Sequence, residues 1–475
     1  MTESSILVLG AGPAGMACAM ELHRAGRTFT LVEKDGQVGG LSKTYRFGEF
    51  RTDNGPHRFF SQNSYLYEFI EDLLAERWEP VDRHTRFCIG GRFYRYPVQW
   101  RDALGNMGPA KALRVVLDFL VAKLTYFRQT PADFEEFAVK TFGRSLANFN
   151  VLNYTEKIWG IPCRELSVDW ARQRIHGLDL ISLITNAFLN RKGPKTLVDQ
   201  FYYPRGGTGL IYESILQRIS ATNRVMLNTV PVKLAHDGER LTLVHLNNGE
   251  QIEPAEVVSS IPITALIDML DPAPSDVIRE HAGALRYRSQ VYLFITIDTP
   301  SVCRDQWIYF PDLEIPFGRI SEMRNFCPTM SPEGKTSLFV EFFCWKGDRV
   351  WKSSKEDLMD LAVPWLTRLG FLTRDEILDC YHIRREDAYP VYDLTYGDHL
   401  RVVKDYLDGF RNLFYIGRPG RFRYTNQDHS LEMGIVAARS ILDNTRYDLE
   451  AGFSEAGYFE GGAPYRANRE GSRSS

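Results

Sequence analysis

Three glycines and one acidic residue near the start of the chain have the spacing of a nucleotide-binding turn. Gly10, Gly12 and Gly15 follow the apolar run SILVLG, and Glu33 ends the next apolar run, TFTLVE. Gly10 permits a tight turn, Gly12 lets a pyrophosphate approach the backbone, and Gly15 lets helix and strand pack closely. Glu33 can accept hydrogen bonds from ribose hydroxyls. This predicts a dinucleotide site, either FAD or NAD, rather than a glycine-rich turn without a ligand.

A second glycine pair follows the ribose-binding strand. Gly39, Gly40 and Leu41 lie in GQVGGLSKT, residues 36–44. Backbone without side chains can approach the same dinucleotide from the other side. This pair favours FAD over NAD. No histidine or cysteine lies in a recognised flavin-linking motif, so we expect FAD to bind noncovalently.

A histidine lies between a turn and two phenylalanines in RTDNGPHRFF, residues 51–60. His57 is either a turn residue bonded to its own loop or a residue held against a molecule bound in the first domain. We find no serine-histidine-carboxylate triad, P-loop or pair of catalytic carboxylates in the sequence.

The elements that must position these residues follow from apolar periodicity. SILVLG, a helix over MACAMELHRAG and TFTLVE form a βαβ unit. Residues 101–195 have helical spacing, and their aromatic residues Phe149, Tyr154, Trp159 and Trp170 are expected in a core. From residue 196 the pattern returns to sheet, with HDGE and NNGE as hairpin turns. A helix is expected over 355–370, a strand at 413–420 and a helix after Asn426.

The composition of the chain indicates which class of protein it belongs to. The chain has 475 residues, 44% hydrophobic and 25% charged, with a formal net charge of −3. These values are typical of a soluble globular protein and give no sign of nucleic acid or of an anionic membrane as partner. The start lacks the features of a secretory signal, and no apolar run is long enough to span a bilayer. Seven scattered cysteines argue against a disulfide framework or a metal site. We expect a cytoplasmic protein.

The predicted fold is α/β: a Rossmann-like FAD-binding domain with a helical insertion and an antiparallel β-sheet substrate domain. Residues 1–100, 196–264 and 391–450 are assigned to the FAD-binding domain, 101–195 to the helical domain and 265–390 to the substrate domain. The polar, glycine-rich residues 451–475 are expected to be a disordered tail.

The glycine turn with its downstream pair resembles the FAD-binding entry of the amine oxidase and phytoene desaturase clan. Within that clan, several stretches resemble UDP-galactopyranose mutases, above all the eukaryotic ones, and they occur in the same order. They are DNGPHRFFS (53–61), GRFYRYPVQW (91–100), NYTEKIWGIP (153–162), YYPRGGTG (202–209), FGRISEMRNFCP (317–328) and GRPGRFRYTNQDHSLEMG (417–434).

The resemblance implies an unusual flavin reaction in carbohydrate metabolism. Reduced FAD attacks the anomeric carbon of a sugar nucleotide through N5, and the sugar changes between pyranose and furanose without net redox change. NAD(P)H is a possible external reductant. The alternative is an FAD-dependent oxidoreductase of the amine oxidase type that takes a hydride from a small molecule. A flavin-bound scaffold without activity is a third reading. The expected partner is a small molecule, possibly a nucleotide sugar, and the oligomeric state stays open.

The resemblance also implies site residues. His57 corresponds to the histidine beside the reactive edge of the flavin, and with Arg418 it is the catalytic candidate. Tyr389, Arg418 and Tyr424 correspond to residues that hold the pyrophosphate, Tyr96 and Gln99 to residues at the uracil end, and Asn426 is a further substrate-binding candidate. The cofactor-binding set is Gly10, Gly12, Ala14, Gly15, Glu33, Gly39, Gly40, Leu41, His57, Val232, Gly417, Asp428, Ser430, Leu431 and Met433.

One position departs from the mutases. They carry a second phosphate-binding arginine at the end of a strand that corresponds to QVYLFITID, where this chain has Asp298. A carboxylate there would repel a pyrophosphate, so Arg288 or Arg319 would have to substitute, or the substrate is not a UDP-sugar. Of Arg418, Arg421 and Arg423, at least one is expected to be part of a solvated basic loop.

Overall fold

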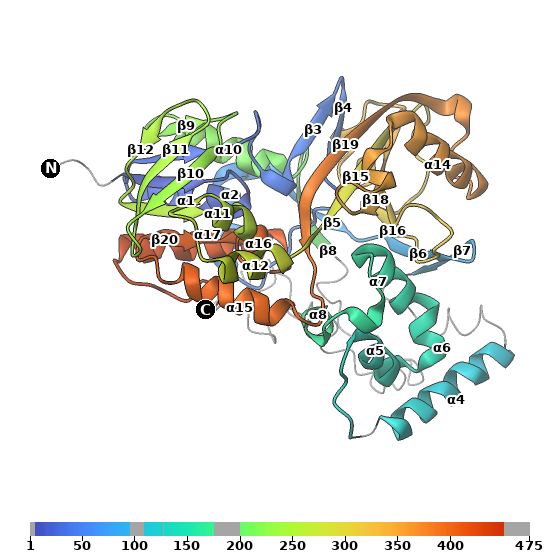
Figure 1. Cartoon of the computed structure of the whole chain (residues 1–475). Coiled ribbons are helices and arrows are strands. Elements are labelled where there is room, and N and C mark those ends of the chain that lie inside the picture. The colour runs from blue at the N-terminus through green and yellow to red at the C-terminus, as the bar shows by residue number, and fades with distance from the viewer. Residues whose placement is uncertain (1–4, 96–108, 127, 175–199, 451–475) are drawn as a thin grey trace, which may run out of the picture.

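The computed structural model describes residues 5–95, 109–126, 128–174 and 200–450 (Figure 1). Its helices are α1 (Pro13–Arg24), α2 (Ser64–Leu74), α4 (Pro109–Thr125), α5 (Phe134–Phe142), α6 (Arg144–Leu146), α7 (Leu152–Trp159), α8 (Val168–Arg174), α10 (Gly209–Ile219), α11 (Ile263–Asp268), α12 (Asp276–Ala284), α13 (Arg349–Lys352), α14 (Lys355–Arg368), α15 (Tyr396–Leu407), α16 (Gly417–Gly420) and α17 (Gln427–Leu442). In these residues no helix is long and apolar enough to cross a membrane.

The strands, which form several sheets, are β1 (Ile6–Leu9), β2 (Phe29–Val32), β3 (Thr44–Phe47), β4 (Phe50–Asp53), β5 (Trp78–Asp82), β6 (Thr85–Ile89), β7 (Arg92–Arg95), β8 (Gln200–Pro204), β9 (Arg224–Met226), β10 (Pro231–His236), β11 (Leu241–Leu246), β12 (Gln251–Ile252), β13 (Glu256–Ser259), β14 (Leu270–Asp271), β15 (Tyr287–Ile297), β16 (Trp307–Tyr309), β17 (Arg319–Glu322), β18 (Thr336–Cys344), β19 (Ile377–Pro390) and β20 (Leu413–Tyr415).

The first unit is a five-stranded parallel sheet in the order β20-β13-β1-β2-β9. Its strands are short, buried apolar runs, as parallel strands covered on both faces require. Helix α1 packs against α17 and α10 (Figure 1). A Cβ added at Gly434 of α17 would lie 2.0 Å from the carbonyl oxygen of Ala14, so α1 and α17 approach closely because this position has no side chain. The predicted Rossmann-like unit is confirmed.

The second unit is a seven-stranded sheet in the order β19-β15-β18-β17-β16-β6-β7, with antiparallel pairs except for β16 and β6. Helix α14, close to the predicted 355–370, packs on β15 and β19. Strands β6 and β7 come from the segment assigned to the FAD-binding domain, yet they extend this sheet. Their ladder partners are far away in the sequence, so local pattern gives no sign of this pairing.

A smaller sheet has the order β12-β11-β10-β14. Both predicted hairpin turns of this sheet are confirmed: Gly238 has φ +100° and Gly249 has φ +85°, as such turns require. One expectation was wrong, because residues 209–219 form α10 and not a strand. GLIYESILQRI buries one helical face against α1, so its period is that of a helix.

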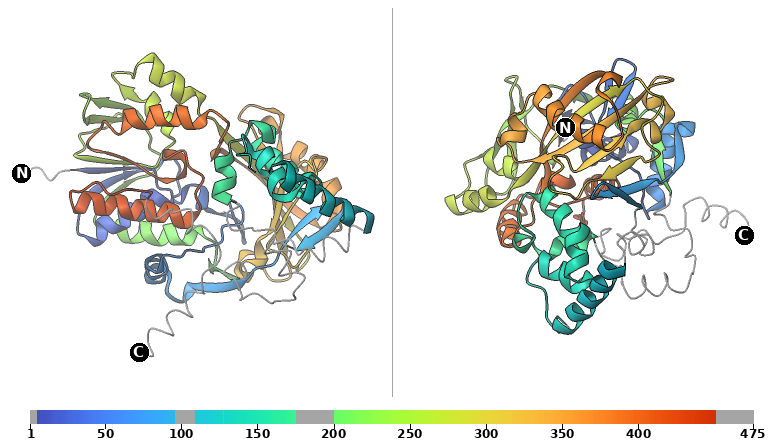
Figure 2. Two further views of the ribbon diagram at one scale, coloured as in Figure 1. Left: turned by 90° about the horizontal axis from the view of Figure 1, so that it is seen from below. Right: turned by 90° about the vertical axis from the view of Figure 1, so that its right-hand side faces the viewer.

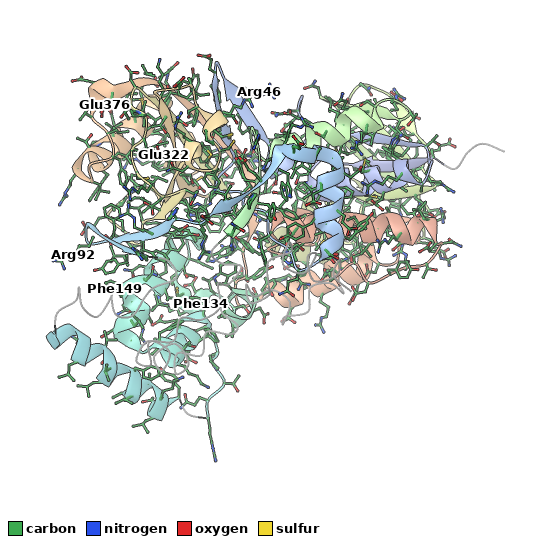
Figure 3. All side chains as sticks on the ribbon, turned by 180° about the vertical axis from the view of Figure 1, so that it is seen from behind. Arg46, Arg92, Phe134, Phe149, Glu322 and Glu376 are labelled. Carbon is green, nitrogen blue, oxygen red and sulfur yellow. The ribbon has the colours of Figure 1, made fainter. Side chains whose placement is uncertain are left out.

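The helical segment α4–α8 lies against the seven-stranded sheet (Figure 2). Trp159 and Trp170 are buried, with ring centroids 4.7 Å apart. Figure 3 shows Phe134 and Phe149 within this segment and Glu322 in the seven-stranded sheet. The predicted tail 451–475 lies outside the described residues.

Candidate functional site

The glycine turn is closed by hydrogen bonds that bring its two glycine segments together. The N–H of Gly39 donates to the carbonyl of Ala11 at 2.7 Å. A Cβ added at Gly40 would lie 2.9 Å from the Cα of Gly12, so the second segment packs directly on the first. Leu41 follows in the short helical turn that starts at Gly40. The structure therefore brings together the two segments that the sequence predicted to share one ligand.

The three glycines of the turn differ in their surroundings. A Cβ at Gly15 would lie 2.0 Å from the carbonyl oxygen of Gly10, which forbids a side chain for packing reasons. A Cβ at Gly12 would have only the Cα of Gly40 near it, at 3.9 Å. Gly12 thus borders space that no described protein atom fills, as a site for a pyrophosphate requires. Gly417 packs on this turn, with a Cβ there 3.2 Å from that of Ala14.

Glu33 is held at the edge of this turn. One carboxylate oxygen accepts from the N–H of Ala11 at 2.6 Å and the other from the N–H of Asp35 at 3.0 Å. Val232 lies in β10 and is 52% exposed. Three residues before it, the N–H of Thr229 donates to the carbonyl of Glu33. Glu33 therefore has the expected position, and Val232 lies on the neighbouring sheet.

Helix α17 begins at the same site. Asn426 is its N-cap, is exposed and makes no side-chain cap bond. The cofactor candidates of the first turns, Asp428, Ser430, Leu431 and Met433, are all buried. The Sδ of Met433 accepts from the N–H of Gly417 at 3.2 Å. The first N–H groups of the helix give this end a partial positive charge.

Asp53 is a buried carboxylate beside the site that sequence reasoning did not single out. Its buried carboxylate accepts from Thr44 Oγ1 at 2.5 Å, from Tyr203 OH at 2.6 Å and from the N–H of Thr208. Thr208 in turn donates to Gln427 at the start of α17. Burial raises the pKa of Asp53 to about 6. The carboxylate joins the segments of the second glycine pair, the His57 loop and α17. The signal for Asp53 in the sequence was the aspartate that opens DNGPHRFFS.

His57 lies at the centre of the site. Its ring is half-buried, and its Nδ1, which solvent does not reach, has no hydrogen-bond partner in the described part of the chain. Burial, with the charges of Arg418 and Arg319, lowers its pKa to about 3. The imidazole is therefore neutral near pH 7. A backbone hydrogen bond with Gly55, in the same loop, acts on this pKa in the opposite direction. The observation that points to a bound molecule is the unpartnered Nδ1.

The neutral His57 predicts a pH dependence of folding. The unfolded chain takes up a proton near pH 6.5, whereas the folded protein resists it down to about pH 3. Stability should therefore fall as the pH drops below 6.5, by about 2 kcal/mol between pH 7 and pH 5 from this residue. In His57→Gln this loss should be absent. The free energy of unfolding in urea at the two pH values measures it, and equal losses in both proteins would contradict it.

Arg418 and two tyrosines form one cluster. The rings of Tyr389 and Tyr424 stack with centroids 5.6 Å apart, and the Arg418 guanidinium lies 5.3 and 4.8 Å from those centroids. Its Nε donates to the carbonyl of Thr425 at 2.8 Å and Nη1 to that of Ala388 at 3.2 Å. These bonds fix the guanidinium, and some of its N–H groups remain for a ligand.

Arg319 is the second arginine of the site. Its guanidinium is bidentate on the fully buried Glu341, at 2.5 and 2.6 Å. A Cβ at Gly55, in the His57 loop, would lie 3.2 Å from Glu341 and 3.4 Å from Arg319. Of the two proposed substitutes, Arg319 lies beside the His57 loop. Arg288 instead donates to the carbonyl of Ile158 at 2.9 Å and stacks over Trp345.

The expectation about Asp298 was wrong. Asp298 is exposed and follows the end of β15, where its N–H donates to the carbonyl of Glu376. Tyr389 pairs with Arg288 at the other end of that strand. Ten residues of strand span roughly 33 Å. The carboxylate is therefore far from the tyrosine pair and cannot repel a ligand there.

Two further expectations concern the arginines after Arg418 and the residues expected at the uracil end. Arg421 and Arg423 are not in a solvated loop, because both pair with Glu450 and their side chains are only 13% and 23% exposed. The sequence did not indicate this pairing because Glu450 lies 29 residues from Arg421 and 27 from Arg423. Tyr96 and Gln99 lie outside the described residues.

Buried polar atoms without partners indicate what the site can hold. Among the described residues they include both amide atoms of Asn54, Nδ1 of His57 and Nε2 of Gln427. Unpaired buried groups of this kind are costly and call for a polar ligand. Such atoms also occur elsewhere in the fold, but these lie in the His57 loop and at the start of α17, while Gly12 and Glu33 form the other end. This arrangement fits a long dinucleotide with a polar ring system.

The chain is similar to known proteins over most of its length. The family of flavin containing amine oxidoreductases matches residues 13–442. A protein described as "Probable UDP-galactopyranose mutase", from Klebsiella pneumoniae, is 25% identical over 460 residues, which cover 94% of this chain and 96% of that protein. The crystal structure of a reduced UDP-galactopyranose mutase has a TM-score of 0.84 at 23% identity, with 97% and 100% of the two chains covered.

An oxidase shares the fold more distantly. Putrescine oxidase bound to putrescine has a TM-score of 0.61 at 15% identity, over 93% of this chain and 99% of that one. Both structural likenesses show a common fold. With its glycine turn, its α17 terminus and the match over residues 13–442, this chain belongs to the family of flavin containing amine oxidoreductases.

Proposed function

We propose that the chain binds FAD between the glycine turn and the His57 loop. Glu33 would hold the ribose, Gly12 would border the pyrophosphate, and the α17 terminus would stabilise negative charge on the reduced ring. The unpaired atoms of Asn54, His57 and Gln427 support this assignment. When reduced, for which NAD(P)H is the proposed source of electrons, FAD supplies a nucleophilic nitrogen.

We further propose that the substrate is a sugar nucleotide and the reaction an isomerisation between pyranose and furanose. The observation that carries this is the charge of Arg418. In the described part of the chain its hydrogen bonds go to carbonyl oxygens, so no carboxylate neutralises it. After burial, the charge of Arg418 is the next largest cause that lowers the pKa of the His57 ring. A site with an uncompensated guanidinium favours a diphosphate over an ammonium group.

The residues of the chain would act by holding and placing the substrate. Arg418 would hold the diphosphate that leaves the anomeric carbon, and the stacked Tyr389 and Tyr424 would place it. The neutral His57 ring can hold or pass a proton at Nδ1.

The alternative is an oxidoreductase that takes a hydride from a small molecule. One observation favours it: Glu341 cancels the charge of Arg319, so the site has less positive charge than two free arginines would give. An amine substrate would still meet the charge of Arg418. A diamine such as putrescine is therefore disfavoured, and an oxidised substrate would have to be neutral or anionic.

Binding tests the two readings. Because a ligand stabilises the folded state it binds, UDP at millimolar concentration should raise the melting temperature of the FAD-loaded protein, and putrescine should not. A shift with putrescine and none with UDP or a UDP-sugar would favour the oxidoreductase.

Arg418→Lys should weaken UDP binding by about 1.5–3 kcal/mol, because lysine cannot form the bidentate fork. The flavin absorption spectrum should not change. Arg421→Lys is the matched control, since Arg421 pairs with Glu450 and should leave UDP binding intact. Titration of UDP by calorimetry measures both. Equal UDP affinity in wild type and Arg418→Lys would remove Arg418 from the substrate site.

A further inference from the structure

Strand β19 carries two consecutive arginines that serve opposite faces of the seven-stranded sheet. Arg384 donates from Nε to the carbonyl of Trp351 and from Nη2 to that of Ser353, both at 2.8 Å. Arg385 lies on the other face, with its guanidinium 5.3 Å from the ring centroid of Tyr45 in β3. Figure 1 shows β3 and β4 beside β19, so Arg385 reaches from the sheet to the nucleotide-binding unit.

The end of the Arg385 side chain lies at the acidic edge of the glycine turn. Its Nη1 is 3.7 Å from Asp35, two residues after Glu33. Asp35 already has a closer partner, the buried ammonium of Lys43. The Nε of Arg385 is buried and has no hydrogen-bond partner in the described residues. A largely buried guanidinium therefore has only a distant, shared carboxylate beside it.

Such an arrangement is costly for a protein unless a ligand completes it. Burial is the main cause that lowers the pKa of Arg385, and Asp35 and Glu33 only partly offset it. Glu33 has both oxygens bonded to backbone N–H groups. A buried cation of this kind calls for an anionic acceptor. A dinucleotide whose ribose lies at Glu33 and whose pyrophosphate lies at Gly12 would bring such anions to this edge of the glycine turn.

We propose that Arg385 is a cofactor-binding residue, which the substrate sheet contributes to the adenosine diphosphate half of FAD. The inference rests on the proposed binding of FAD but not on the proposed isomerisation. The seven-stranded sheet, which also carries Arg319 and Glu341, would then contact the cofactor through Arg385. FAD binding then helps to fix the sheet against the nucleotide-binding unit.

The experiment compares three variants, with FAD affinity of the apoprotein measured by flavin fluorescence. Arg385→Met should raise the Kd for FAD at least about tenfold, since a charge-assisted contact is lost. Arg385→Lys should lie between Met and wild type, because it retains the charge without the fork. Arg384→Met, the neighbour on the other face, should keep the wild-type Kd. The melting temperature of each apoprotein is recorded as well.

The outcomes separate a contact from a structural role. The proposal stands if Arg385→Met weakens FAD binding while the melting temperature of its apoprotein stays at the wild-type value. The proposal is overturned if Arg385→Met binds FAD as tightly as wild type, or if Arg385→Met and Arg384→Met weaken FAD binding equally. It is also overturned if Arg385→Met lowers the melting temperature of the apoprotein as much as that of the FAD-loaded protein. A wild-type protein that binds no FAD would instead refute the cofactor assignment.

Discussion

Gly12→Leu protein should purify without colour. The leucine side chain would enter the space that borders Gly12, where only the Cα of Gly40 lies within 4 Å of an added Cβ. The fold should tolerate the change, but the pyrophosphate would lose its place, so we expect FAD affinity to fall by more than about a hundredfold. The absorption of the purified protein near 450 nm, in the visible flavin band, gives the occupancy (about zero is expected).

A matched change elsewhere controls for general damage. Gly283 in α12 has no atom within 4 Å of an added Cβ, so Gly283→Leu should stay yellow. If Gly12→Leu retained full FAD occupancy, the glycine turn would not be the pyrophosphate site.

His57→Ala should retain most of its FAD but lose turnover. The glycine turn, Glu33 and α17 are expected to hold the dinucleotide, whereas His57, with its unpaired Nδ1, is proposed to face the reactive ring. We expect turnover to fall by at least about tenfold, or roughly 1.4 kcal/mol of lost transition-state stabilisation. The reduction potential and the flavin spectrum should shift. FAD occupancy and turnover are measured on the same preparation.

The exposed His84 provides the control for this variant. His84→Ala should match wild type in all three readouts. Full turnover with an unaltered spectrum in His57→Ala would make His57 a turn residue. Loss of FAD together with turnover would make it a residue that holds the cofactor.

The parts predicted from the sequence are those with a local cause. The glycine turn and the hairpin at Gly238 follow from backbone conformations that few residue types adopt. Glu33 followed from its place at the end of the apolar run TFTLVE. The start of α17 followed from a polar cap before an apolar helix. His57 stood out because a histidine between a turn and two phenylalanines is either a turn residue or a residue held against a bound molecule.

The parts that were missed depend on contacts between distant segments. Asp53 is defined by partners more than a hundred residues away, Tyr203 and Thr208, so the stretch DNGPHRFF shows the aspartate but not its partners. Arg385 differs from Arg384 only by the face of β19 on which it lies. Asp298 was misplaced because a resemblance between strands does not fix their register, and an error along a strand moves a side chain by 3.3 Å or so per residue.

The most direct test of the account is a balance of substrate and electrons. Protein reduced with dithionite under anaerobic conditions is mixed with UDP-galactopyranose and with other UDP- and dTDP-sugars, and the products are followed by chromatography and NMR. The account predicts that at least one sugar nucleotide is isomerised over many turnovers, that the flavin stays reduced, and that the oxidised protein is inactive. Reoxidation of the flavin in step with substrate consumption, or turnover of a neutral or anionic substrate only by the oxidised protein, would contradict it.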